Sequence, residues 1–280
     1  MAILCLPIFL FSLLIAEQKT ITLNEVVEDI SKLKVNCDYN GGDIIFSSSD
    51  SQFSLNAYIQ YEKTAIETSL NYEKIGKTGI FDMEAELLSN FDFSFNSDKK
   101  NVSSQVLLPE KIPAKLNLDI GMSDLELDLE KVLISGINLD FGMGDGIVHL
   151  GKGAPERDCK SLDIDIGMGS MEIKNIGEFD CKYMEFEVGM GSLTLEYSNH
   201  ILQDLDFDIS VGLGSVSILV PRSVNVKFLY DQNILSDVDL DEMVLVDNDT
   251  YRNENFNKGN PTLTFSASVG MGSLSLNWVD

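Results

Sequence analysis

Apolar and polar residues alternate strictly along much of the chain, and paired glycines interrupt the alternation at a recurring place. In the stretch SLDIDIGMGSMEI, residues 161–173, leucine and isoleucine occupy one parity and aspartate the other until Gly167. After Gly169 a second short alternation follows, in which Met171 and Ile173 are the apolar residues. Period-2 alternation is typical of a strand with one buried and one solvated face. The pattern predicts strand, glycine corner and second strand.

The same pattern occurs in six copies, whose first glycines are separated by 21, 25, 22, 23 and 58 residues. A unit of this length cannot bury its apolar face alone, so copies are expected to stack and share a core. The sequence therefore predicts an all-β fold, a single-chain β-solenoid of coils of about 22 residues. The last and longest gap is long enough for two more divergent coils. The expected structural corners are Gly121, Gly142, Gly144, Gly167, Gly169, Gly189, Gly191, Gly212, Gly214, Gly270 and Gly272.

The chain divides by regularity into segments of one continuous domain. We expect a signal peptide at 1–16, less regular N-terminal strands at 17–110, the regular repeat at 111–221 and closing coils at 222–280. Residues 23–33 allow either a short capping helix or an irregular lead-in to the first strand. Residues 96–101 are polar and form the best internal boundary. Strands are expected at 54–63, 81–88, 90–97 and 103–109.

The opening of the chain has the length of a signal-peptide apolar core. The apolar run at 2–16 is shorter than the roughly 20 residues that span a bilayer, and Ala16 ends it in a small residue. No Lys or Arg precedes the run. We expect export with cleavage near Ala16, and an uncleaved anchor is the alternative.

The charge excludes some partners. The 280 residues carry a formal net charge of −25, with 44% hydrophobic residues. Such a field repels phosphate backbones and anionic lipids, so we expect no nucleic-acid partner. Contact with a membrane is expected only through an uncleaved leader or a protein partner.

The acidic residues invite two kinds of chemistry. Paired carboxylates can act on glycosidic bonds, but such a reaction needs one carboxyl in an apolar pocket, which nothing in the sequence marks. We therefore expect no catalytic residues and no cofactor. The acidic residues weighed for catalysis are Asp163, Asp165, Asp204, Asp206 and Asp208. Clustered oxygens in the closing segment are weak calcium candidates. These candidates are Asp237, Asp239, Asp241, Asp247 and Asp249.

Two further residue sets share a position in the repeat. A methionine follows the first glycine in five of the six copies, and Leu213 takes its place in the fifth copy. Thioethers are suitable copper(I) ligands, but the parity of these methionines continues that of the inward-facing residues, so we expect them to fill the core at the corner. The methionines are Met122, Met143, Met168, Met190 and Met271. Cys159 and Cys181 each stand 8 residues before a first glycine, so adjacent coils would place them close enough for a disulfide.

The phased GMGS copies resemble the toastrack family of bacterial envelope proteins, which includes the C-terminal domain of LiaF-type stress regulators and adhesin-like β-repeat proteins. The resemblance extends to the segments at 32–49, 211–228 and 250–277. It implies an exported protein of a bacterial envelope, in the periplasm, on the outer surface or extracellular, and it implies no shared catalytic residues. The expected function is a non-enzymatic, adhesin-like interaction scaffold for a protein or glycan partner. The alternatives are a LiaF-like regulatory module that contacts a membrane stress sensor, and a β-helix carbohydrate enzyme.

Overall fold

The computed structural model shows an all-β protein. It describes residues 18–62, 66–87, 102–151, 159, 161–179, 181–198, 201, 203–230, 236–257 and 259–279. The only helix in this part of the chain is one 3₁₀ turn, η1 (Ile176–Glu178). No helix within the described ranges is both long and apolar enough to cross a membrane.

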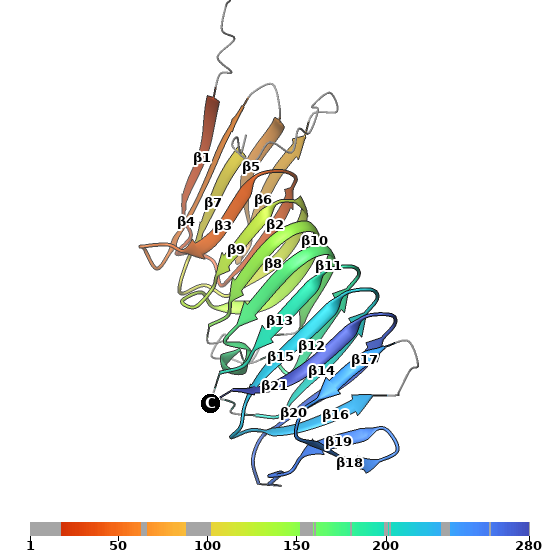
Figure 1. The fold of residues 1–280 in the computed structure, drawn as a ribbon. Coiled ribbons are helices and arrows are strands. Elements are labelled where there is room, and N and C mark those ends of the chain that lie inside the picture. Colours follow the sequence, from red (N-terminus) through yellow and green to blue (C-terminus); the bar gives the residue numbers. More distant parts are fainter. Residues whose placement is uncertain are drawn as a thin grey trace, which may run out of the picture.

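The strands stack like rungs in two rows, which share β10 and β11 because these two strands run through the corner (Figure 1). In spatial order the first row holds β5 (Ile66–Ile75), β6 (Thr78–Leu87), β2 (Lys32–Tyr39), β8 (Ala114–Met122), the first half of β10 (Ile134–His149), the first half of β11 (Leu162–Lys174), β12 (Tyr183–Val188), β14 (Leu205–Val211), β20 (Thr262–Val269), β16 (Asn225–Tyr230), β19 (Thr250–Asn253) and β18 (Met243–Asp247). The second row holds β1 (Gln18–Val26), β4 (Ser54–Glu62), β7 (Val102–Leu108), β3 (Asp43–Ser48), β9 (Asp124–Asp128), the second halves of β10 and β11, β13 (Ser192–Glu196), β15 (Ser215–Pro221), β21 (Ser273–Val279) and β17 (Asp237–Leu240).

Equivalent residues of successive repeats are paired in parallel. Leu162 of β11 pairs with Met184 of β12, which in turn pairs with Phe207 of β14. These partners are 22 and 23 residues apart, as are the first glycines of the same copies. Inward residues such as Ile164 and Phe186 are fully buried, and the buried apolar side chains of all levels form one cluster. Each outward position therefore stacks above its counterpart, about 4.8 Å away.

The last repeat lies in a different place from the one that its sequence position predicts. The 58-residue gap between the fifth and sixth first glycines is long enough for two further coils, but β20 pairs directly with β14, and β21 with β15. The intervening β16 and β17 lie on the far side of β20 and β21. The rings of Phe207, Phe265 and Phe228 stack in that order, with centroids 4.9 Å and 5.7 Å apart. The segment lacks a glycine pair that matches the fifth copy, whereas the sixth copy supplies one.

The N-terminal end has the same kind of insertion. β2 and β3 lie between β6–β7 and β8–β9, although they precede all four strands in the sequence. The lead-in to β2 is a strand, β1, and not a helix. The strands expected at 54–63, 81–88 and 103–109 are confirmed as β4, β6 and β7. The leader at 1–16, the strand at 90–97 and the boundary at 96–101 lie outside the described residues.

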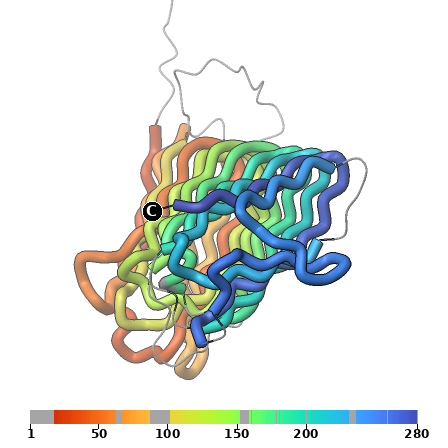
Figure 2. The backbone as a smooth tube through the Cα atoms, turned by 60° about the horizontal axis from the view of Figure 1, so that its bottom comes forward, coloured from red at the N-terminus to blue at the C-terminus, as the bar shows by residue number. Residues whose placement is uncertain are grey.

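Glycine is needed at the corners chiefly because backbones of adjacent levels approach closely there. A Cβ on Gly142 would lie 2.6 Å from the carbonyl oxygen of Gly121, and one on Gly167 would lie 2.6 Å from that of Gly142. Such contacts are shorter than van der Waals separation, so these corner positions require glycine. The backbones of successive levels run closely side by side in the tube view (Figure 2). Gly144 and Gly169 also have φ of 140° and 136°, where β10 and β11 bend without breaking.

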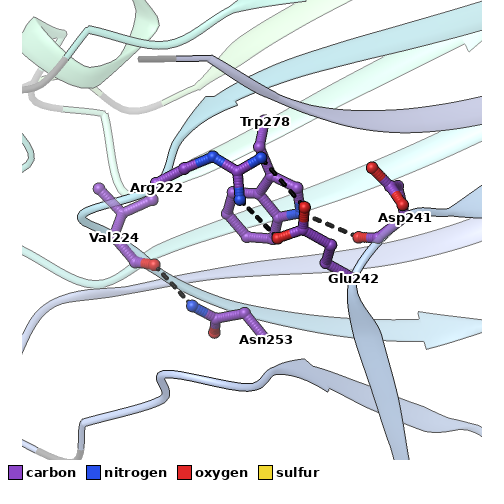
Figure 3. Close-up of polar contacts among 6 residues, drawn as sticks. All are labelled: Arg222, Val224, Asp241, Glu242, Asn253 and Trp278. Atoms are coloured by element: carbon purple, nitrogen blue, oxygen red, sulfur yellow. Dashed lines mark hydrogen bonds and ion pairs between the residues drawn. The ribbon is translucent and has the colours of Figure 1, made fainter.

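Two side-chain links join different levels of the stack. Cys159 and Cys181 form a disulfide with their Cα atoms 5.0 Å apart, which ties together the segments that lead into β11 and β12. At the other end, Arg222 Nη1 and Nη2 bind Glu242 Oε2 and Oε1 at 2.5 and 3.0 Å, beside the indole of Trp278 (Figure 3). Glu242 has φ of 53°, and its turn joins β17 to β18. The ion pair therefore joins the end of β15 to the turn after β17, across β21, whose Trp278 donates its indole N–H to the Asp241 carbonyl at 2.9 Å.

Candidate binding surface

Six carboxylates form one straight column on the outward face of the first row. Consecutive cross-strand partners along five strand pairs are all acidic, and all six side chains are exposed. We call this set the acidic column. In spatial order it consists of Glu84, Asp38, Asp119, Asp140, Asp165 and Glu187.

A second outward column runs beside the acidic column and changes from amide to acid along the stack. At its N-terminal end, Asn36 Nδ2 donates to Asp82 Oδ1 at 2.7 Å, and Asn117 Nδ2 donates to Asn36 Oδ1 at 2.9 Å. Farther along, Asp163 pairs with Glu185, and Glu185 with Asp208. The amide end is held by hydrogen bonds between levels, whereas the acidic end adds three more carboxylates beside the acidic column.

Two carboxyls of the acidic column have a raised pKa. Partial burial, followed by the charges of Asp38 and Asp140, raises the pKa of Asp119. Partial burial and the charges of Glu187, Asp163 and Asp140 raise the pKa of Asp165 in the same way. Like charges directly opposite on adjacent strands are destabilising, so this face favours any cationic group that approaches it.

The corner beside the acidic column corrects one expectation. The repeated methionines were expected inside, but Met122, Met168, Met190 and Met271 are 37%, 39%, 58% and 62% exposed, and Met143 is half-buried. Inward parity ends at Ile166 and resumes at Met171, because the chain bends between them. Met168 and Ser170 lie within this bend and are exposed, so their side chains are outside the core.

A shallow groove of about 800 Å³ lies where the corner leads into the strands of the second row, in the C-terminal half of the stack. Three kinds of column line it: glycines, the exposed methionine positions with Leu213, and serines that are cross-strand partners of one another. Asp237 of β17 lies at one end. The serines are Ser170, Ser192, Ser215 and Ser273.

The family follows from a match to a family model over residues 14–174, described as the N-terminal domain of toast_rack, DUF2154. The match covers more than half of the chain. The chain belongs to the toast_rack family. No curated protein matches the sequence.

Several solved structures resemble the toast_rack chain at low identity. A candidate cell adhesion protein from Clostridium sporogenes is 17% identical with a TM-score of 0.49, over 94% of this chain and 100% of its own. A candidate adhesin from Bacteroides fragilis is 12% identical with a TM-score of 0.43, over 94% and 99%. A candidate lipid-binding protein from Parabacteroides distasonis is 12% identical with a TM-score of 0.36, over 93% and 96%. These likenesses are too distant to carry an argument about this chain.

The remaining acidic candidates of the toast_rack chain are dispersed. Within the described ranges, no group of three or more His, Cys, Asp or Glu side chains is arranged to hold a metal ion, so the calcium candidates are not brought together. Asp247 Oδ1 accepts a hydrogen bond from the Asn248 amide at 2.8 Å, and Asp249 Oδ1 accepts one from Thr250 Oγ1 at 3.0 Å. Asp204 Oδ1 accepts a hydrogen bond from the Thr262 amide at 2.8 Å, a contact that holds the start of β20.

Sequence reasoning identified outward aspartates but not the acidic column. Its members in the regular repeat stand two residues before the first glycine of their copies, as Asp140 does before Gly142. Alignment on the glycines gives the register, so this part of the column was visible in the sequence. Glu84 and Asp38 were not, because the order of the N-terminal levels differs from the order of the chain.

Proposed function

We propose that this toast_rack chain is a non-enzymatic, exported scaffold of a bacterial cell envelope, built as a β-solenoid of coils of about 22 residues. Its acidic column binds a basic segment of an envelope protein. The observation that carries the proposal is the in-register stacking of six exposed carboxylates. Location in the envelope rests on the predicted leader at 1–16 and on the family.

Repulsion within the acidic column lowers the free energy of unfolding of the chain. The column contains five consecutive like-charge pairs. Cross-strand pairs contribute roughly 0.2–1 kcal/mol each, so each of these pairs destabilises the fold by about that amount. Alternating charges or the neutral serines that continue the column at Ser210 and Ser268 would avoid this cost. A basic partner offsets the repulsion on binding, and a stack with one continuous core keeps the carboxylates in place for it.

The charge of the surface defines the experiment. The full chain is sedimented with envelope fractions of its native cells at low and high salt, because screening shortens electrostatic range from about 10 Å at 0.1 M to about 3 Å at 1 M. A column variant replaces four carboxylates by amides. These changes are Asp119→Asn, Asp140→Asn, Asp165→Asn and Glu187→Gln.

A matched control removes the same charge from exposed positions away from the column. These changes are Glu25→Gln, Asp50→Asn, Glu67→Gln and Glu254→Gln. We expect salt-sensitive binding by the parent and the control, and loss of binding by the column variant. Equal binding by both variants would refute the role of the column, and binding that ignores salt would indicate a neutral glycan instead of a basic protein.

A further inference from the structure

The corner methionines form a column of thioethers that the fold does not use for its core. Met122 pairs with Met143, and Met143 with Met168, as cross-strand partners in parallel strands. Met190 follows on the next level, where its amide donates to the Gly167 carbonyl at 2.8 Å. We call Met122, Met143, Met168 and Met190 the methionine column. Adjacent members are about one strand spacing, 4.8 Å, apart at the backbone.

Met122, Met168 and Met190 are exposed and Met143 is half-buried, and none of the four belongs to the hydrophobic core cluster. The sulfur atoms of the exposed members are therefore accessible. Glycines precede and follow Met143 and Met168, so the flanking positions carry no side chain. An unbranched thioether has three rotatable bonds. On this ridge two sulfurs from adjacent levels can therefore turn toward each other.

The softness of thioether sulfur determines which metal ion a methionine pair can bind. Thioether sulfur is soft and uncharged, so it suits copper(I), whereas calcium and magnesium prefer the oxygens of carboxylates and carbonyls. The acidic column runs parallel to the methionine column, since Asp119, Asp140 and Asp165 each stand three residues before a methionine. Its charge attracts cations to the ridge without supplying the soft ligands.

We propose that the methionine column binds copper(I), with each ion held by the Sδ atoms of methionines on adjacent levels. Binding needs no proton release and no change of oxidation state, since the thioether is neutral and the metal arrives as copper(I). Leu213 then marks an interruption, because it separates Met190 from Met271 on the next level. The acidic column and the methionine column are independent sites under this proposal.

The experiment measures copper(I) affinity of the full chain without oxygen, with ascorbate as reductant, in competition with a chromophoric copper(I) chelator. All proteins carry Cys5→Ala and Cys37→Ala, so that neither of the two cysteines outside the disulfide contributes a thiol. The test variant carries Met143→Leu and Met168→Leu, which remove two sulfurs while keeping apolar side chains. The control carries Met171→Leu and Met184→Leu, two methionines that are buried in the core.

Loss of a direct ligand should weaken binding at least by the roughly 10–100-fold that loss of an outer ligand partner costs. We expect that loss in the test variant, parent-like affinity in the control, and an increased copper(I) stoichiometry in Leu213→Met. No copper(I) binding by the parent, or equal affinity in the test variant, overturns the proposal. X-ray absorption on the parent gives an independent result, because only sulfur neighbours around copper agree with it and oxygen neighbours contradict it. The amide column variant keeps every thioether, so it should still bind copper(I) with sulfur neighbours, and the scaffold proposal and the copper(I) proposal can fail separately.

Discussion

Gly189 offers a graded test of how closely the levels approach at the corner. A Cβ at this position would lie 2.9 Å from the carbonyl oxygen of Gly167 and 3.4 Å from that of Ile166. The same two oxygens accept hydrogen bonds of 2.8 Å from the amides of Met190 and Gly189. The corner therefore cannot retreat from an added methyl group without stretching the bonds that join the two levels.

The magnitude follows from these contacts. Overpacking of a tight site costs roughly 1–3 kcal/mol, so Gly189→Ala should lower the free energy of unfolding by about 2 kcal/mol. Gly189→Val adds two more carbons and should also lose both hydrogen bonds, each worth roughly 0.5–1.5 kcal/mol, for a total of about 2–6 kcal/mol. A loss of 2 kcal/mol corresponds to a fall in Tm of roughly 4–8 °C for a chain of this size.

Urea unfolding and thermal melts followed by circular dichroism measure both variants. Gly259→Ala is the matched control, because its Cβ would meet only Asn257 Oδ1, at 3.7 Å. It should melt like the parent. If Gly189→Val also melted like the parent, the close approach of the levels at this corner would be wrong.

Three further predictions concern stability. Replacing Cys159 and Cys181 by alanine removes a disulfide between residues 22 apart in the sequence and should lower the free energy of unfolding in urea by about 3 kcal/mol. A parent-like midpoint would contradict a stabilising disulfide between levels. The raised pKa of Asp119 and Asp165 contributes stability at low pH that is lost as pH rises through their folded-state pKa values. The double amide variant at these two positions should therefore melt above the parent at pH 7, with the advantage shrinking as pH falls toward about 4, and a pH-independent difference would refute the repulsion. Phe265→Ala should cost roughly 3–5 kcal/mol, since its ring lies between two others in the core, and a loss below 1 kcal/mol would contradict the inserted position of β20.

The local fold could be predicted from the sequence because each repeat carries the same pattern of alternating residues and glycines. Alternation from Leu162 to Ile166 allows a strand and little else, and the recurring glycines give the parallel register of neighbouring levels. The order of the end levels was not readable. The local pattern predicts that β20 is a strand. Its pairing with β14 depends on the relative stability of all possible strand pairings, which the local pattern does not contain.

The methionine column shows where counting parity fails. Met168 shares the parity of Ile164 and Ile166, yet the bend at Gly167 and Gly169 turns it outward. The signal was the parity change after the corner, since Met171 and Ile173 occupy the opposite parity. When the buried positions are even-numbered before a short bend and odd-numbered after it, some residues within the bend must face outward.

Photo-crosslinking in native cells tests the scaffold function most directly. A photoreactive amino acid replaces Ser210, which continues the acidic column past Glu187, and a second protein carries it at Thr22, an exposed position on β1 in the second row. Mass spectrometry identifies the crosslinked products. The account predicts one dominant basic envelope protein from position 210, absent from position 22 and lost when the four column carboxylates are amides. Identical products from both positions, or none from position 210, would contradict it.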